Sequence, residues 1–112
     1  MDEETILGPL CVIPIGEGRR FEVRGTTVAV FHTRAGQVFA TQAECPHQGG
    51  PLADGLVGGS TLICPLHERA FDLVTGAGIG QSCALRTYPV RITQDGTIGL
   101  RMQKPAEAKH AR

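Results

Sequence analysis

The chain has 112 residues, and its 11 Lys and Arg balance its 11 Asp and Glu, so that the formal net charge is zero. This length predicts one domain, and the balanced charge argues against binding to nucleic acid or to a membrane surface through bulk electrostatics. Aromatic residues make up 4% of the chain and Trp is absent. The stacking platforms of single-strand binding proteins are therefore not expected.

The sequence carries no signal for export or for a membrane. Residues Met1–Thr5 are acidic and lack the positive start of a secretory signal, and no apolar run approaches the roughly 20 residues that span a bilayer. We expect a cytoplasmic protein, in which four cysteines serve as metal ligands or free thiols rather than a disulfide framework. We expect a domain over residues 1–103 and a charged, frayed tail over residues 104–112.

Fifteen Gly and seven Pro divide the chain into short apolar runs without a helical period. The runs are rich in β-branched and aromatic residues and are separated by turn residues such as Asp95–Gly96, which is typical of strands and hairpins. In chain order, the expected strands are Leu10–Ile13, Phe21–Val23, Thr27–Phe31, Val38–Ala40, Thr61–Ile63, Ala70–Leu73, Tyr88–Thr93 and Thr97–Leu100. Many short strands predict an all-β domain, an antiparallel sandwich or barrel.

The segment Glu44–Gly59 differs from the rest because it is rich in Gly and Pro and has almost no β pattern. A long irregular segment inside a small β domain is usually functional. It contains Cys45-Pro46-His47, and a spacer of 16 residues separates His47 from Cys64-Pro65-Leu66-His67. Two thiolates and two imidazoles on two loops can hold one metal centre.

Two metal centres fit this set of ligands. Structural zinc takes Cys and His in tetrahedral sets, whereas a Rieske [2Fe–2S] cluster takes two Cys on one iron and two His on the other. The C-x-H spacing of the first loop is unusual for zinc sites, where C-x-x-C pairs are the rule, so the spacing favours the cluster. Glycines such as Gly49 and Gly50 would let backbone N–H groups approach the cluster sulfides.

From Leu10 to Arg101, the chain resembles the Rieske family. The resemblance rests on the two ligand motifs and on their flanks, Gly50–Gly55 and Phe71–Gly76. It implies a Rieske-type antiparallel β-sandwich of three stacked sheets, with two cluster-binding loops at one tip. It also implies that Cys45 and Cys64 hold the buried iron and that His47 and His67 hold the outer iron. The exposed imidazole edges would be the electron port, rimmed by Gln48, Gly49, Leu52, Pro65, Leu66 and Glu68.

Within the family, the chain resembles the ferredoxin-type members. High-potential members carry one more Cys in each loop, and these two form a disulfide; the matching positions here are Gly50 and Leu66. Those members also place a Ser hydroxyl near a cluster sulfide, where Glu68 and Arg69 stand here. Fewer donors and a nearby carboxylate imply a low reduction potential.

Two candidate functions follow from the resemblance, and a third follows from the Cys and His residues alone. Ile13–Arg19, Ala29–Phe31 and Cys83–Val90 are similar to the small subunit of NAD(P)H-dependent assimilatory nitrite reductase, and Glu68 departs from the Gly common in dioxygenase ferredoxins. These features favour one-electron transfer as such a small subunit. The alternative is a ferredoxin that shuttles electrons from a flavin reductase to a ring-hydroxylating dioxygenase, and the second alternative is a structural zinc-binding module.

The implied partners are a flavin-containing reductase and a terminal reductase or oxygenase. The sequence shows no paired carboxylates, no Ser/His/Asp arrangement and no phosphate loop, so any catalysis belongs to a partner.

Among the other reactive residues, we expect Cys11 to be buried in a strand and Cys83 to pack near the cluster. We expect His32 to face solvent and Tyr88 to pack beneath the cluster or to end a strand.

Overall fold

The computed structural model describes residues 4–45, 50–65, 69–80 and 83–101. Within these ranges the chain forms three antiparallel sheets and two short 3-10 turns, η1 (Leu10–Val12) and η2 (Leu52–Asp54). The strands are β1 (Glu4–Pro9), β2 (Glu17–Val23), β3 (Thr26–His32), β4 (Val38–Gln42), β5 (Leu56–Gly58), β6 (Thr61–Ile63), β7 (Ala70–Asp72), β8 (Gly78–Ile79), β9 (Thr87–Tyr88), β10 (Val90–Ile92) and β11 (Thr97–Arg101).

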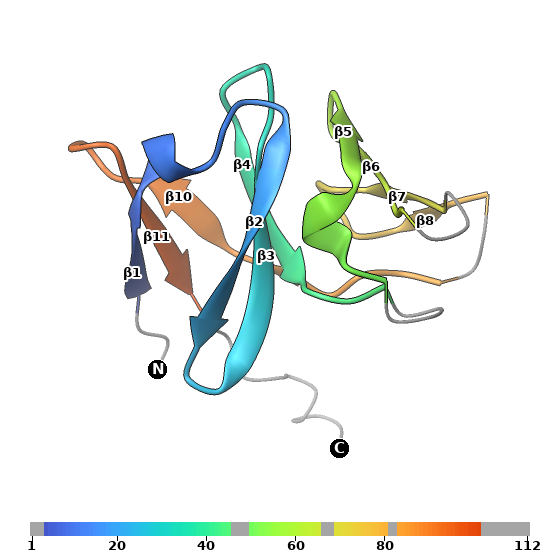
Figure 1. Ribbon diagram of the computed structural model, residues 1–112, viewed down its shortest axis with the longest axis horizontal. Coiled ribbons are helices and arrows are strands. Elements are labelled where there is room, and N and C mark those ends of the chain that lie inside the picture. The colour runs from blue at the N-terminus through green and yellow to red at the C-terminus, as the bar shows by residue number, and fades with distance from the viewer. Residues whose placement is uncertain (1–3, 46–49, 66–68, 81–82, 102–112) are drawn as a thin grey trace.

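The three sheets lie next to one another across the molecule (Figure 1). The outer sheet has the order β1-β11-β10, the middle sheet β2-β3-β4-β9 and the small sheet β5-β6-β7-β8. Every strand pair is antiparallel. The prediction of an all-β, three-sheet antiparallel fold is thus confirmed. None of the described helical segments is long and apolar enough to cross a bilayer.

Strand β3 connects the two hydrophobic cores because both of its faces are buried. Val28 and Val30 point into an outer core with Ile98 and Leu100 of β11. The alternate residues, Ala29 and Phe31, point into an inner core beneath the small sheet. A strand covered on both faces needs a continuous apolar run rather than an alternating one, and Val28–Phe31 is such a run.

The small sheet docks on the middle sheet through η2. The inner core contains Leu52 and Ala53 of η2 together with Phe31, Leu62 and Phe71. Gly18 of β2 permits the close approach: a Cβ at this position would lie 2.6 Å from Cδ1 and Cε1 of Phe31 and 3.2 Å from the carbonyl oxygen of Ala53. The absence of a side chain at residue 18 therefore sets the spacing between the two layers.

Two expectations about the N-terminal region are wrong. The sequence analysis placed the first strand at Leu10–Ile13, whereas the first strand is β1 and residues Leu10–Val12 form the 3-10 turn η1. The Ile13 N–H donates to the Leu10 carbonyl at 2.9 Å, and the Leu10 N–H donates to the Gly96 carbonyl. This turn directs Cys11 outward, so that Cys11 is exposed and not buried in a strand.

The later strands follow the expected positions more closely. The Tyr88–Thr93 run is divided at Pro89 into β9 and β10, which belong to different sheets. The expected turn at Asp95–Gly96 is present, with Gly96 at a φ of 82°. The irregular segment Glu44–Gly59 contains a strand that was not expected, β5. The proposed C-terminal tail, residues 104–112, lies outside the described residues.

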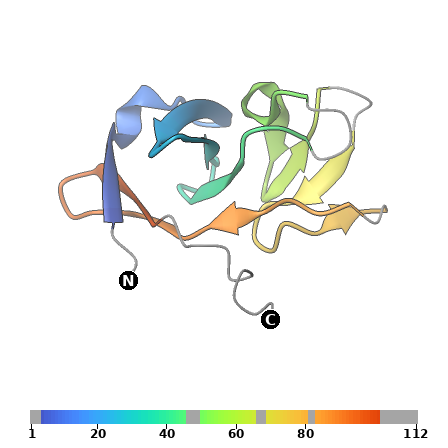
Figure 2. The ribbon, with the colours of Figure 1, turned by 90° about the horizontal axis from the view of Figure 1, so that it is seen from below.

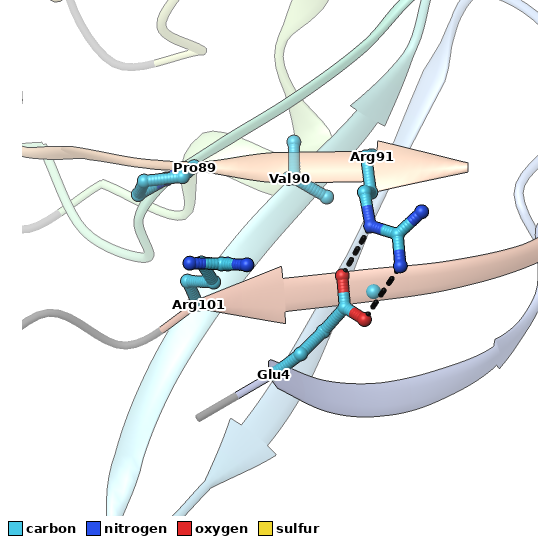
Figure 3. A pocket seen from close by; sticks show the side chains of 6 residues that line it. Glu4, Pro89, Val90, Arg91 and Arg101 are labelled. Carbon is cyan, nitrogen blue, oxygen red and sulfur yellow. Dashed lines mark hydrogen bonds and ion pairs between the residues drawn. The ribbon is translucent and has the colours of Figure 1, made fainter. Parts of the chain in front are cut away.

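A cross-strand ion pair joins the two edge strands of the outer sheet (Figure 3). Arg91 of β10 donates from Nε to Oε2 of Glu4 at 2.6 Å and from Nη2 to Oε1 at 2.9 Å. The carboxylate of Glu4 reaches across β11 because Gly99 has no side chain; a Cβ there would lie 2.5 Å from Oε2. The pair borders a shallow hollow of about 80 Å³.

The contact between Gly18 and Phe31 predicts that a single methyl group destabilises the fold. Gly18→Ala forces the Cβ against a fully buried ring, and we expect it to lower the free energy of unfolding by about 1–3 kcal/mol, the usual cost of overpacking. Urea denaturation measures the change. Gly58→Ala is the matched control, since a Cβ there meets nothing within 4 Å. Equal stability of the two variants would contradict the packing argument.

The Glu4–Arg91 pair predicts a stability difference that depends on pH. The hydrogen bond from Arg91 holds the pKa of Glu4 below its ordinary value, so the pair stabilises the fold above the ordinary pKa of glutamate and loses this effect as pH falls through the lowered pKa. Glu4→Gln should therefore melt below the wild type at neutral pH, and the two melting temperatures should converge in acid. A gap that widens on acidification would refute this assignment.

Candidate metal centre

Two loops with the same backbone closure carry the two predicted cysteine ligands. The first loop follows β4, and the N–H of Cys45 donates to the carbonyl of Gly50 at 2.8 Å. The second loop joins β6 to β7, and the N–H of Cys64 donates to the carbonyl of Arg69 at 2.7 Å. Each cysteine thus opens its loop and bonds to the residue five positions later.

The strand pairing outside each loop fixes where the loop begins. An isolated β-bridge between Glu44 and Pro51 precedes Cys45, and the pair Ile63 and Ala70 of β6 and β7 precedes Cys64. The two thiol-bearing residues are therefore held by paired backbone directly before them. This pairing fixes the backbone position of each cysteine, as a metal site requires of its ligands.

Both cysteines are buried in the inner core. Cys45 is 4% exposed and Cys64 is 0% exposed, and both belong to the same apolar cluster as Leu52, Phe71 and Leu85. None of the four cysteines of the chain takes part in a disulfide. The fold thus brings two thiols from two different sheets into one apolar environment.

The chemistry of these donors fits an iron–sulfur centre. Metals bind the thiolate form of cysteine, and a thiolate buried among apolar residues is costly unless a positive charge compensates it. A centre that contains iron supplies that charge at the position where the two loops begin. Gly50, at the end of the first loop, is itself buried, which suits a glycine that lies close to such a centre.

The predicted histidine ligands, His47 and His67, lie outside the described residues. So do Gln48, Gly49, Leu66 and Glu68, four of the six residues expected to rim the site. Of the other two, Pro65 is exposed, as expected. The prediction for Leu52 is wrong: it is completely buried, because η2 turns its side chain into the inner core, so it cannot meet a partner.

The structure also describes three other residues for which the sequence analysis made a prediction. Cys83 is half-buried and packs against the inner core that contains both predicted cysteine ligands. Tyr88 ends β9 and packs in the outer core, away from the thiols. His32 was expected to face solvent, but it is half-buried, and its Nδ1 lies 2.9 Å from the carbonyl oxygen of Ile13.

The sequence analysis missed the part played by Gln42 and by residues 83–86. Gln42 is the last residue of β4, and its side-chain amide bonds to backbone groups of Glu44 and Arg86. Nothing in the sequence distinguishes this glutamine from an ordinary polar residue at a strand end. Only the fold shows that Arg86 lies beside it, 44 residues further along the chain.

Comparison with known proteins agrees with this site. The family model described as "Rieske [2Fe-2S] domain" matches residues 6–89. The ferredoxin component of the naphthalene 1,2-dioxygenase/salicylate 5-hydroxylase systems of Ralstonia sp. is 33% identical, with 71% of this chain and 78% of that protein covered. The naphthalene 1,2-dioxygenase ferredoxin component of Pseudomonas aeruginosa is 34% identical, with the same coverage.

Solved structures share the fold. The Sphingomonas yanoikuyae B1 ferredoxin superposes with a TM-score of 0.78 at 29% identity, with 90% of this chain and all of that chain covered. A structure described as an NADH-dependent nitrite reductase small subunit from Mycobacterium tuberculosis gives a TM-score of 0.86 at 23% identity, covering 93% and 98% of the two chains. Because the family model spans most of the sequence and two buried cysteines open the matching loops, the chain belongs to the Rieske [2Fe–2S] domain family, whose members bind a [2Fe–2S] cluster.

Proposed function

We propose that this protein transfers single electrons, with one [2Fe–2S] cluster ligated by Cys45, His47, Cys64 and His67. The observation that carries the proposal is the pair of buried thiols at the openings of two equivalent loops. Each loop also contains one histidine in the sequence, two residues after Cys45 and three after Cys64. This gives two sulfur and two nitrogen donors, the ligand set of a Rieske cluster.

The bound cluster supplies a one-electron redox couple. The contribution of the chain is to set its charge: two neutral imidazoles in place of two thiolates make the centre less negative, so that it accepts an electron more easily than a four-cysteine cluster does. The apolar inner core around Cys45 and Cys64 keeps water from the sulfur ligands, which also tunes the potential.

We place the potential at the low end of the Rieske range. A disulfide between the two loops is the mark of the high-potential members, and here Gly50 and Leu66 stand at the positions that would form it. All four cysteines lack a disulfide, in keeping with a ferredoxin-type member. Cysteines without disulfides are typical of proteins in the reducing cytoplasm, where we propose that this protein works.

For the electron acceptor, we propose a terminal oxygenase, with a flavin-containing reductase as the donor. This choice rests on the relatives: the ferredoxin components of naphthalene and 2,4-dinitrotoluene dioxygenase systems are 32–35% identical to this chain. A shuttle of this kind should form a small, transient interface with each partner in turn.

A second candidate is the small subunit of an assimilatory nitrite reductase. It is favoured by Ile13–Arg19 and Cys83–Val90, which are similar to such subunits, and by Glu68 in place of the glycine common in dioxygenase ferredoxins. In that case the protein would be a fixed subunit with a larger interface, and the acceptor would be a terminal reductase.

Substitution of the ligands tests the site. Cys64→Ser should abolish or strongly weaken cluster binding, seen as loss of visible absorption and of iron. Cys11→Ser is the matched control, because Cys11 is exposed on η1, and it should keep the full spectrum. His67→Cys should retain a cluster but lower its potential, since a third thiolate adds negative charge.

Two results of this experiment would overturn the proposal. One is an unchanged redox spectrum in Cys64→Ser. The other is a colourless wild-type protein that contains stoichiometric zinc, which would identify the site as a structural zinc centre.

Reconstitution with partners distinguishes the two candidate functions. We expect the protein to accept electrons from an NADH-dependent flavin reductase and to support turnover of a ring-hydroxylating oxygenase, without co-eluting with either enzyme in gel filtration. In assimilatory nitrite reductases of this kind, the small subunit works beside a large subunit that carries flavin and sirohaem. Stable co-purification with such a large subunit, together with no electron delivery to the oxygenase, would instead support the nitrite reductase subunit.

A further inference from the structure

Gln42 forms a polar link between two segments that flank the candidate metal centre. Its backbone N–H donates to the carbonyl of Arg86 at 2.9 Å. Its side-chain Oε1 accepts the N–H of Arg86 at 2.7 Å, and its Nε2 donates to the carbonyl of Glu44, also at 2.7 Å. Glu44 directly precedes Cys45, so one amide group connects the start of the first loop to Arg86.

The orientation of this amide is fixed by its two partners. The backbone N–H of Arg86 can only donate and the backbone carbonyl of Glu44 can only accept. Only one of the two amide orientations of Gln42 satisfies both groups at once. The side chain therefore replaces one of the two backbone bonds that Gln42 and Arg86 could exchange, directly after Thr41 and Thr87, the last paired residues of β4 and β9.

The segment that Gln42 holds is also bound to the small sheet. The N–H of Leu85 donates to the carbonyl of Gly76 at 2.7 Å, and Ala84 forms a β-bridge with Ala77. The stretch from residue 83 to β9 runs from the small sheet towards the middle sheet along one side of the molecule (Figures 1 and 2). Residues 84–86 are thus bonded both to β4 of the middle sheet and to the turn between β7 and β8 of the small sheet.

This link matters because the two cysteines belong to different sheets. Cys45 follows β4 of the middle sheet, and Cys64 follows β6 of the small sheet. Two of the connections between them are the apolar inner core and the hydrogen-bonded path from Glu44 through Gln42, Arg86 and the adjacent Leu85 to Gly76. Apolar contacts resist separation but are not directional, whereas hydrogen bonds fix direction.

We propose that Gln42 is a positioning residue, which holds the Cys45 loop in register with the Cys64 loop through its bonds to Glu44 and Arg86. The inference rests on the proposed function, in which both loops ligate one cluster. It assigns to a half-buried glutamine of β4 a role in retaining the cluster and in setting the geometry of its ligands, without contact with the cluster itself.

Two substitutions separate the two halves of the link. Gln42→Leu removes both side-chain bonds, whereas Gln42→Glu keeps an acceptor for the Arg86 N–H and loses the donor to Glu44. Gln94→Leu and Gln94→Glu are the matched controls, because Gln94 is an exposed glutamine in the turn between β10 and β11. The readouts are the lifetime of visible absorption under a chelator, the EPR spectrum of the reduced protein, and amide hydrogen exchange at Cys45 and Arg86.

In Gln42→Leu we expect about tenfold faster exchange at Arg86 and about tenfold faster loss of the cluster, the scale of one or two hydrogen bonds, with shifted EPR g-values. In Gln42→Glu we expect protection at Arg86 to persist while Cys45 exchanges faster and the cluster is lost sooner. Both Gln94 variants should match the wild type.

The inference is overturned if Gln42→Leu, or Gln42→Glu where the former does not fold, keeps the wild-type cluster lifetime and EPR spectrum. A wild-type protein without iron would refute the proposed function instead. In that case, exchange at Cys45 in the metal-free chain still decides the role of Gln42: unchanged exchange in both Gln42 variants would refute it.

Discussion

Cys45 follows a strand of the middle sheet and Cys64 follows a strand of the small sheet, yet both side chains lie in one apolar core. Much of the fold holds these two residues in position. A thiolate in such surroundings is unfavourable without a compensating cation, so the two side chains have to arrive at a shared position with little freedom. Paired backbone directly before each cysteine, and a hydrogen bond from each cysteine N–H across its loop, provide this constraint.

The layers behind the loops keep the two starting points at a fixed separation. β3 is the central element, since Phe31 packs under the small sheet while Val30, its neighbour, packs against β11. Gly18 then allows η2 to lie close to β2 and to the ring of Phe31. The two predicted cysteine ligands are thus anchored in paired backbone and in the packed inner core.

Much of this arrangement could be predicted from the sequence. Runs such as Thr27–Phe31 specify strands, because this signal is local in the chain. The motif Cys45-x-His47 with Cys64-x-x-His67 is equally local and predicts four donor residues, of which the structure describes the two buried cysteines. The failures occurred where tertiary contacts decide. Leu52 appeared to be part of an open loop, yet η2 buries it, and Cys11 appeared to lie within an apolar strand, yet η1 exposes it. The link through Gln42 had no sequence signal, since its partner Arg86 comes close only in the folded chain.

The division of the hydrophobic residues into two cores has a consequence for assembly. The outer core is built from residues such as Ile13, Val28, Tyr88 and Leu100 and includes no cysteine, whereas the inner core includes Cys45 and Cys64, the two proposed cysteine ligands. Removal of the metal would therefore leave buried thiols without a compensating charge in the inner core only. We expect assembly of the inner core to depend on the metal and that of the outer core to depend on apolar packing alone, because metal binding is coupled to folding where the ligands lie.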